Sequence, residues 1–448
     1  MRIGPLDRVC LRPALALLLF LCSCSSGPQR PGLPRPPLDP ATLQLVERKQ
    51  ISRRVEQLTF TTPALDGPTH VDVILPDLYA AEPDRRYPVV YLLQGAIDDF
   101  TAWIAEGNAE ALSAGYPYIL VLPDAGNEGY YSDWYNDGAW GPPQWETYHI
   151  RQLLPWIDAH YRTKAERGQR AVAGVSMGGF GALSYAARHP DLFAAATSYS
   201  GMVDINFASD RISTPDSVFG QPGEQDIRWR GHNPWDLAGN LHGVDVMLYS
   251  RNGLPSRHWM HLDPAEIIVH MQNVSLHKRL LAAGVPHQWH DIGSGPHKWP
   301  IWQDDLADTL LQLLKVFADP PPAPDKVWYT AIEPDYTVFG WHVVLQRGVT
   351  EFSTLADADR GGFSLSGSGG GTVTTPSLYA PGTRVSATLQ SATATQRLEL
   401  QAGADGRLAV PLTLGPANRY QARTDAAEQD GGTKVYTTTV RFEPAGRR

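Results

Sequence analysis

The chain has 448 residues, 42% of them hydrophobic, and carries 38 Lys and Arg against 47 Asp and Glu, a formal charge of −9. This length and apolar content suffice for one large core and favour two. The negative charge and the lack of a basic run argue against a nucleic-acid partner. All three cysteines, Cys10, Cys22 and Cys24, lie near the N-terminus, so the remaining chain can form no disulfide and no cysteine metal site.

The N-terminal segment has the pattern of a bacterial secretory signal. Basic residues precede an apolar run from Ala14 to Leu21, which is too short to span a bilayer comfortably. The run ends at Leu21-Cys22-Ser23-Cys24, which resembles a lipobox with Cys24 as the lipidated residue. We therefore expect a lipoprotein signal peptide over 1–23 and a Pro-rich tether over 24–50. The protein would be exported and anchored through lipid to the outer face of the membrane; the alternative is plain secretion.

Strands and helices are predicted to alternate over residues 51–318. The predicted strands are 55–60, 70–75, 87–93, 118–122, 171–175, 194–199, 245–249 and 287–292. The predicted helices are 107–113, 148–161, one after Ser176 that ends before Pro190, 264–283 and 302–317. Such alternation predicts an α/β fold with a doubly wound, mostly parallel sheet covered on both faces. Residues 204–240, rich in Gly, Pro and charged side chains, are expected to be a loop-rich insertion that shapes the pocket.

The amino-acid composition changes after the Pro-rich stretch at 319–325, which is predicted to be a linker. Residues 326–448 are rich in Thr, Val, Ser and Gly. They show short alternating runs at 337–344, 385–389, 397–400 and 433–442. This pattern predicts a small all-β sandwich domain whose role the sequence does not reveal.

The apolar run that ends in Gly174-Val175-Ser176-Met177-Gly178 is typical of a nucleophilic serine. A serine on a sharp strand-to-helix turn needs small neighbours, because Cβ atoms would clash in so tight a bend. Its hydroxyl would then stand at the carboxyl edge of the sheet and at a helix N-terminus, which favours developing negative charge.

A serine hydroxyl becomes a good nucleophile only when a base takes its proton and an acid orients that base. His297 is the preferred base, because it lies in a loop after the last predicted strand, at the sheet edge where ligands gather. The acid should follow the strand that ends at Tyr249, which leaves Asp263 and Glu266. Asp263 directly precedes Pro264 and has the pattern of a helix N-cap, so Glu266 is preferred.

The tetrahedral intermediate of acyl transfer requires an oxyanion hole. One donor is expected to be the backbone N–H of Met177, the residue after the nucleophile. The second should come from the loop after the 87–93 strand, and we expect the N–H of Ala96. Neither a metal nor a diffusible cofactor is required by this chemistry.

Several motifs in the same order resemble one family. They are Leu92-Leu93-Gln94-Gly95, Tyr131-Ser132-Asp133-Trp134-Tyr135, Asn252-Gly253 and His297-Lys298-Trp299-Pro300-Ile301-Trp302. Residues from about 51 to 317 thereby resemble the esterase D family, which has the α/β-hydrolase fold, and most closely its secreted mycolyltransferases of the antigen 85 type. The resemblance implies that the catalytic glutamate falls on Glu266, counting back from Ala282-Ala283-Gly284. It also marks Trp299, Trp134 and Asp98 as candidate substrate contacts.

Departures from the mycolyltransferase pattern bear on the acceptor. Gln94 and Ile97 stand where those enzymes carry an aspartate and an arginine that contact trehalose, and Ser250 replaces a cysteine of their pattern. We therefore expect a serine esterase or acyltransferase that acts on lipid or sugar esters of the cell envelope. One alternative is a secreted carboxylesterase or feruloyl-type esterase. Another, of a different class, is a non-catalytic surface lipoprotein that binds glycan or matrix.

Overall fold

The computed structural model describes residues 42–422 and 424–444. The expected signal peptide, the lipidation site at Cys24 and most of the expected tether lie outside the described residues. Within the described ranges, no helix is long and apolar enough to cross a membrane.

The first part of the chain forms a nine-stranded sheet in the order β1-β2-β3-β5-β4-β6-β7-β8-β9. The strands are β1 (Gln44–Gln50), β2 (Val55–Thr61), β3 (Thr69–Ile74), β4 (Val89–Leu93), β5 (Ile119–Pro123), β6 (Arg170–Val175), β7 (Ala195–Tyr199), β8 (Asp245–Ser250) and β9 (His287–Asp291). Strands β4 to β9 pair in parallel, whereas β1, β2 and β3 add an antiparallel flank. This is the predicted mostly parallel sheet.

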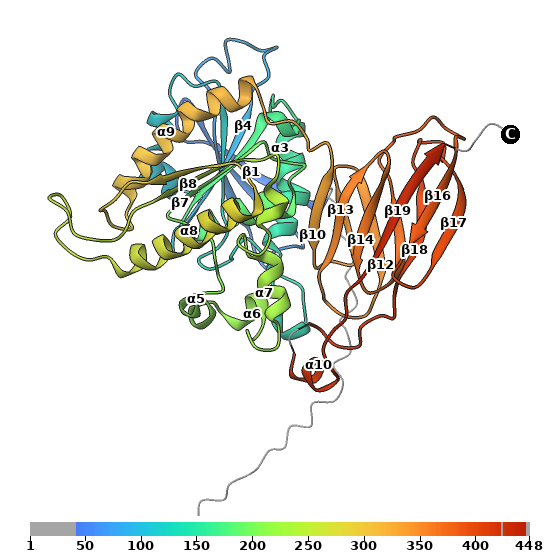
Figure 1. Ribbon diagram of the computed structural model, residues 1–448. Helices are drawn as coiled ribbons and strands as arrows, with labels where there is room; N and C mark the ends of the chain where they lie inside the picture. The colour runs from blue at the N-terminus through green and yellow to red at the C-terminus, as the bar shows by residue number, and fades with distance from the viewer. Residues whose placement is uncertain (1–41, 423, 445–448) are drawn as a thin grey trace, which may run out of the picture. The chain divides into compact units, whose positions relative to one another are not determined.

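Helices cover both faces of this sheet, as Figure 1 shows. On one face pack α3 (Leu154–His160), α4 (Met177–Arg188) and α8 (Pro264–Ala283); on the other pack α1 (Ala102–Ala105), α2 (Ala109–Leu112) and α9 (Trp299–Ala318). The strands supply both cores by alternation: Tyr91 and Leu93 face the first core, whereas Val90 and Leu92 face the second. Burial on both faces explains why β4 and β5 are continuous apolar runs.

Helix α8 begins and ends as its sequence predicts. The side chain of Asp263 caps it by accepting hydrogen bonds from the backbone N–H groups of Ala265 and Glu266, and Pro264 occupies the first turn. Gly284 closes the helix in the left-handed conformation, with φ of 69°. These caps fix where α8 begins. They thereby fix where Glu266, in its first turn, lies at the edge of the sheet.

Two segments differ from the sequence-based expectation. Residues 44–50, expected in the tether, form edge strand β1, which pairs antiparallel with β2. All seven residues of β1 are exposed, so no apolar pattern marks it. The helix expected over 148–161 consists of a π-helical stretch, η3 (Thr147–Leu153), followed by α3.

The insertion at 204–240 is more helical than expected. It contains the short helices α5 (Ala208–Ser213), α6 (Asp216–Phe219), α7 (Asp226–His232) and η5 (Ala238–Leu241). Val218, Phe219 and Trp229 in this segment are fully buried in the first core. None of these helices exceeds seven residues, which is too short for a clear helical period in the sequence.

The C-terminal part is built from antiparallel strands, as predicted. A six-stranded sheet runs β10-β13-β14-β19-β16-β17 and a four-stranded sheet runs β11-β12-β15-β18. The strands are β10 (Val327–Ala331), β11 (Asp335–Val338), β12 (Trp341–Gln346), β13 (Ser353–Asp359), β14 (Gly362–Gly367), β15 (Gly369–Thr374), β16 (Arg384–Gln390), β17 (Thr395–Gln401), β18 (Ala409–Gly415) and β19 (Tyr436–Pro444); one short helix, α10 (Asp425–Gln429), precedes β19. Both sheets contribute to one apolar core, the arrangement of a β-sandwich.

A partly buried ion-pair network joins helix α4 to its surroundings. Arg188, at the last turn of α4, contacts Glu146 at 2.9 Å and Glu333 at 2.7 Å. Burial alone would raise the pKa of Glu146, but Arg188 and His189 outweigh that effect and hold it well below its usual range. The helix that begins at Ser176 is therefore fixed at its far end by charged partners.

Candidate active site

Ser176 lies on a sharp turn between β6 and α4. Its backbone has φ of 55° and ψ of −117°, a strained conformation for a residue with a Cβ atom. Its side chain is half-buried. The backbone N–H of Ser176 donates to the carbonyl of Tyr199 at the end of β7, which holds the turn against the neighbouring strand.

The two glycines of the Ser176 motif are required by close backbone approach. A Cβ atom on Gly174 would lie 2.2 Å from the carbonyl oxygen of Gly178. A Cβ atom on Gly178 would lie 2.3 Å from the carbonyl oxygen of Leu93, at the end of β4. Both distances are too short for any side chain, so the spacing of glycines around Ser176 follows from the packing of α4 on the sheet.

His297 and Glu266 form a hydrogen-bonded pair. Nδ1 of His297 donates to Oε2 of Glu266 over 2.7 Å. The Glu266 side chain is 0% exposed, whereas that of His297 is 16% exposed. Oε1 of Glu266 accepts from the Ser200 hydroxyl at 2.9 Å and from the backbone N–H of Arg251 at 2.8 Å. The buried carboxylate therefore has three donors, which offset the loss of water.

Asp263 also contacts His297, but through the backbone. Its Oδ1 caps α8, and its Oδ2 accepts from the backbone N–H of His297 at 3.0 Å. Burial alone would raise the pKa of Asp263, yet these backbone donors outweigh it and lower the pKa. Glu266 thus meets the ring and Asp263 the main chain of the same histidine.

Two residues that the sequence reading did not single out complete this pair. Ser200, directly after β7, donates to Glu266 and accepts from Nε1 of Trp302 at 3.3 Å. Arg251, directly after β8, holds Glu266 by its backbone and forms a buried bidentate pair with Asp305 of α9, at 2.8 and 3.1 Å. Their position just past apolar parallel strands is the one signal that could have marked them.

The loop after β4 passes close to Ser176. A Cβ atom on Gly95 would lie 3.6 Å from Cβ of Ser176. Neither the backbone N–H of Ala96 nor that of Met177 donates to another described residue, so both predicted oxyanion donors have free N–H groups. Next to Ala96, Ile97 has φ of 63° and projects outward.

Asp98 and Trp299 lie together beside this loop. The indole of Trp299 and the backbone of Gly95 both lie beside the Asp98 carboxylate. Burial raises the pKa of Asp98, and these polar neighbours only partly offset the effect. The ring of Trp299 packs at a steep angle on Trp103 and on Trp302, at 5.0 and 5.3 Å between centroids. Trp302 in turn packs 4.8 Å from the ring of His297, so Asp98 and Trp299 belong to the same site.

Trp134, the third expected substrate contact, occupies a different environment. It is partly buried against the first core, and its Nε1 donates to the carbonyl of Gly129. Its hydrogen bonds to other described residues, to Gly129 and Pro143, involve neither Ser176 nor His297.

The Ser176 hydroxyl makes no hydrogen bond to His297 or to any other described residue. Both residues nonetheless follow carboxyl ends of parallel strands, β6 and β9, and so share one edge of the sheet. In free enzymes the contact between nucleophile and base is often long and tightens when substrate binds. The described residues contain no group of three or more His, Cys, Asp or Glu that could hold a metal ion.

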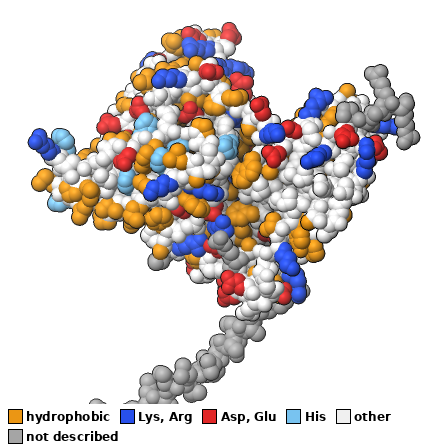
Figure 2. All heavy atoms as spheres, in the orientation of Figure 1, with side chains coloured by type: hydrophobic (Ala, Val, Ile, Leu, Met, Phe, Trp, Pro, Cys, Tyr) orange, Lys and Arg blue, Asp and Glu red, His pale blue; other side chains and the backbone are white. Residues whose placement is uncertain are grey.

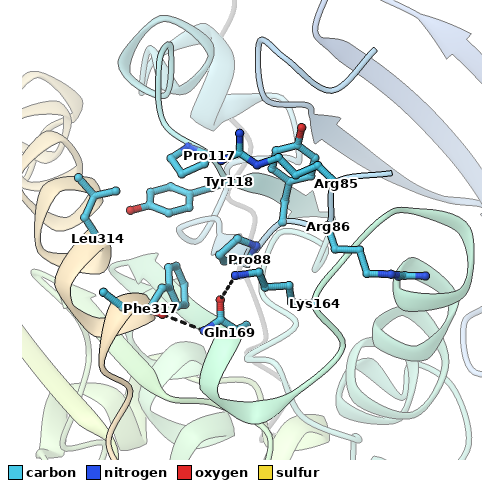
Figure 3. A pocket seen from close by; sticks show the side chains of 11 residues that line it. Arg85, Arg86, Pro88, Pro117, Tyr118, Lys164, Gln169, Leu314 and Phe317 are labelled. Carbon is cyan, nitrogen blue, oxygen red and sulfur yellow. Dashed lines mark hydrogen bonds between the residues drawn. The ribbon is translucent and has the colours of Figure 1, made fainter. Parts of the chain in front are cut away.

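A separate cavity of about 350 Å³ lies at the opposite edge of the sheet, and its lining is drawn in Figure 3. Its residues, among them Pro88, Pro117 and Gln169, precede β4, β5 and β6, and Phe317 of α9 closes one side. Lys164 and Phe317 both bond to Gln169 there, through Nζ and the carbonyl oxygen respectively. The cavity is remote from Ser176, which follows the other end of β6.

The sheet order, the helices on both faces and the strained serine after a central strand define an α/β-hydrolase. The model of the putative esterase family matches residues 62–313, more than half of the chain, and the protein belongs to that family.

Two curated relatives illustrate the family. Esterase Rv1288 of Mycobacterium tuberculosis is 35% identical over 268 residues, which cover 56% of this chain and 58% of the relative. The match thus spans little more than half of that relative's length. The diacylglycerol acyltransferase/mycolyltransferase Ag85B of Mycobacterium leprae is 30% identical over 254 residues, 50% of this chain and 76% of the relative.

The fold is shared with a solved structure of low sequence identity. An S-formylglutathione hydrolase from Agrobacterium tumefaciens superposes with a TM-score of 0.50 at 15% identity, over 62% of this chain and 100% of that one. This likeness concerns the fold alone. It agrees with the α/β-hydrolase architecture expected from the sequence.

Proposed function

We propose that the protein is a serine esterase that works through Ser176, His297 and Glu266 and forms an acyl-enzyme on Ser176. The single observation that carries the proposal is the 2.7 Å hydrogen bond between His297 Nδ1 and the fully buried Glu266. Full burial of a carboxylate costs free energy of folding, so such a group is kept either for a function or because its hydrogen bonds fully compensate for the lost water. Here it fixes the tautomer of a histidine that follows the strand edge next to a strained serine, which is the arrangement of acyl-transfer enzymes.

The reaction would proceed in two halves. Nε2 of His297 removes the proton from the Ser176 hydroxyl while the oxygen attacks the ester carbonyl. Glu266 stabilises the resulting imidazolium through Nδ1, and the N–H groups of Met177 and Ala96 bind the oxyanion. His297 then returns the proton to the leaving alcohol, and the acyl group remains on Ser176.

In the second half, water or an alcohol accepts the acyl group from Ser176. We propose lipid or sugar esters of the cell envelope as substrates, with a sugar or lipid alcohol as a possible acceptor. The support is the similarity to a protein named as a diacylglycerol acyltransferase and mycolyltransferase, together with Trp299 and Asp98 beside the nucleophile. The indole and the carboxylate suit the apolar face and the hydroxyl groups of a sugar.

We also propose that the protein reaches these substrates at the membrane. The N-terminal pattern favours export and lipidation of Cys24, which would hold the enzyme at the outer face of the membrane. Radiolabelled palmitate incorporated into the wild type but not into Cys24→Ser would support the anchor, and equal labelling would refute it.

The function is tested by mass spectrometry of the acyl-enzyme, with p-nitrophenyl esters from short to long chains, with and without trehalose or glycerol. We expect an adduct on Ser176 that a sugar or glycerol discharges faster than water. Fast turnover of short esters, at a rate that added alcohol does not change, would instead identify a simple hydrolase. Substantial hydrolysis by Ser176→Ala, with folding verified by circular dichroism, would refute the assignment of the nucleophile.

A further inference from the structure

Exposed apolar side chains gather on the loops around the candidate active site. Ile97 is 83% exposed, Met260 76%, Leu262 59%, and Leu254 and Ile292 47% each. All five lie on loops that leave the carboxyl ends of parallel strands β4, β8 and β9. We call these five residues the apolar rim. They surround the same sheet edge that carries Ser176 and His297.

The longest of these loops, residues 254–262, is firmly held at its base. The backbone N–H of Asp263 donates to the carbonyl of Gly253, and that of Gly253 donates to Gly295. Gly295 belongs to the loop that carries His297, so the base of the 254–262 loop is joined to the catalytic candidate. Trp259 packs partly buried against the second core, while Leu254, Met260 and Leu262 point to solvent. The exposure is therefore a property of an anchored loop.

The 254–262 loop carries only basic charge, whereas the other two rim loops carry exposed acids, Asp99 near Ile97 and Asp291 next to Ile292. Residues 254–262 contain Arg257 and no acidic side chain, in a protein whose formal charge is −9. Lys298, next to His297, lies with its Nζ 5.9 Å from the ring of Trp259. Figure 2 shows basic, histidine and apolar side chains together on the projecting loop between β8 and α8, with apolar side chains continuing along α8. Met271 and Leu281 of α8 are exposed as well.

We propose that the apolar rim, with Arg257 and Lys298, docks the enzyme onto an anionic lipid surface. Large apolar side chains gain by leaving water for the acyl region of a lipid layer, and nearby cations gain from anionic headgroups. The inference rests on the proposed function, because it makes lipid-embedded esters the substrate class of the same site.

Docking would place the mouth of the site against the layer that holds the substrate. An ester could then move from the layer to Ser176 without full transfer through water. The structure therefore predicts a difference between two substrate forms: esters within a lipid layer depend on the apolar rim, whereas dissolved short-chain esters do not.

The test uses the exported full chain with Cys24→Ser, so that no attached lipid contributes to binding. The variant Leu254→Ser/Met260→Ser/Leu262→Ser is compared with its parent by flotation on vesicles of phosphatidylglycerol and phosphatidylcholine in equal parts. We expect vesicle affinity to fall by about tenfold or more. Hydrolysis of an emulsified long-chain ester should fall in parallel, and hydrolysis of dissolved p-nitrophenyl acetate should stay unchanged.

A matched control removes equally exposed apolar side chains elsewhere: Leu78→Ser/Leu311→Ser/Val435→Ser should bind vesicles like the parent. Ser176→Ala should bind vesicles normally yet hydrolyse neither ester, so failure of the proposed function is separable from failure of docking. The docking proposal is overturned if the loop variant binds vesicles like the parent, or if the control variant loses binding equally. It is also overturned if sedimentation shows a dimer that the loop variant dissociates, because the rim would then contact a second copy of the chain.

Discussion

The backbone N–H of His297 donates to Oδ2 of Asp263 over 3.0 Å, while the ring of the same residue bonds to Glu266. The two acids of one helical turn thus hold one histidine at two points. Asp263 fixes where the main chain of His297 lies, and Glu266 fixes how its ring is turned.

The division predicts different effects for the two acids. Glu266→Gln should lower kcat by about 10³–10⁴-fold, because an amide cannot stabilise the imidazolium that forms during the reaction. Asp263→Asn should lower kcat far less, by about tenfold or less, and should cost about 1 kcal/mol of stability through the weakened cap of α8. Steady-state kinetics and urea unfolding measure both. Equal losses of kcat in the two variants would contradict the assignment of Glu266 as the orienting acid.

The close approach of α4 to the sheet predicts strict intolerance at Gly178. Gly178→Ala would bring Cβ to 2.3 Å from the carbonyl oxygen of Leu93, so the helix must shift. We expect a loss of about 1–3 kcal/mol in the free energy of unfolding, and lower activity, because the shift moves Ser176.

Gly67→Ala is the matched control, since nothing lies within 4 Å of its new Cβ atom. Its stability should stay within about 0.5 kcal/mol of the wild type. Denaturant titrations measure the free energy of unfolding of both variants. An unchanged value for Gly178→Ala would contradict the prediction, because it would show that α4 has room to relax.

The two tryptophans marked as substrate contacts should separate on mutation. Trp299→Ala removes a polar neighbour of Asp98 and a packing partner near His297, so kcat/KM should fall by about 10–100-fold. Trp134→Ala removes an indole that packs on the core and bonds to Gly129, so it should chiefly lower stability, by about 3 kcal/mol. Kinetics paired with thermal unfolding distinguish the two. The reverse pattern would place the substrate near Trp134 instead.

Buried Asp210 predicts a pH-dependent stability. Burial raises its pKa from 3.8 to about 7, although Gln272 donates to its Oδ2. Between these values the folded chain retains a proton that the unfolded chain releases, so this group's contribution to stability declines as pH rises through the window. Asp210→Asn, which cannot ionise, should equal the wild type near pH 4 and exceed it in stability at pH 8.

Asp84→Asn, at an exposed site, controls for the loss of one negative charge. Chemical unfolding of the three proteins at pH 4, 6 and 8 gives the comparison. A constant difference between Asp210→Asn and the wild type across this range would show that Asp210 ionises normally in the folded protein.

The elements that the sequence predicted well are those in which burial or helix capping produces a recognisable pattern of residue types. Strands β4 and β5 are buried on both faces and therefore read as continuous apolar runs. The bounds of helix α8 are predicted by Asp263 and Pro264 at its start and by Gly284 at its end. In these segments local chemistry and tertiary position agree.

Other elements have no such pattern of residue types. Strand β1 is held by backbone hydrogen bonds to β2, and its seven exposed side chains have no alternation to detect. The run at 337–344, expected as one strand, is divided between β11 and β12 because Gly340 turns the chain with φ of 80°. Pairing partners and turns of this kind depend on the fold as a whole.

The candidate site shows the same limit. Motif and strand order mark Ser176 and His297 as candidates. The N-cap pattern at Asp263 favoured Glu266 as the acid, but only the geometry shows that both acids reach His297, one at its ring and one at its main chain. Ser200 and Arg251 bind Glu266 from the ends of two other strands, a relation that exists only after the sheet has formed.

Strand β19 is the last of the described strands in sequence, yet it lies inside the six-stranded sheet, between β14 and β16. During synthesis the strands β10, β13 and β14 therefore emerge long before the strand that joins them to the β16–β17 hairpin. Until residues 436–444 leave the ribosome, two unfinished sheet edges remain open to wrong partners. A ribosome that stops shortly before β19 would release a chain that contains the whole nine-stranded sheet but whose C-terminal six-stranded sheet is in two pieces.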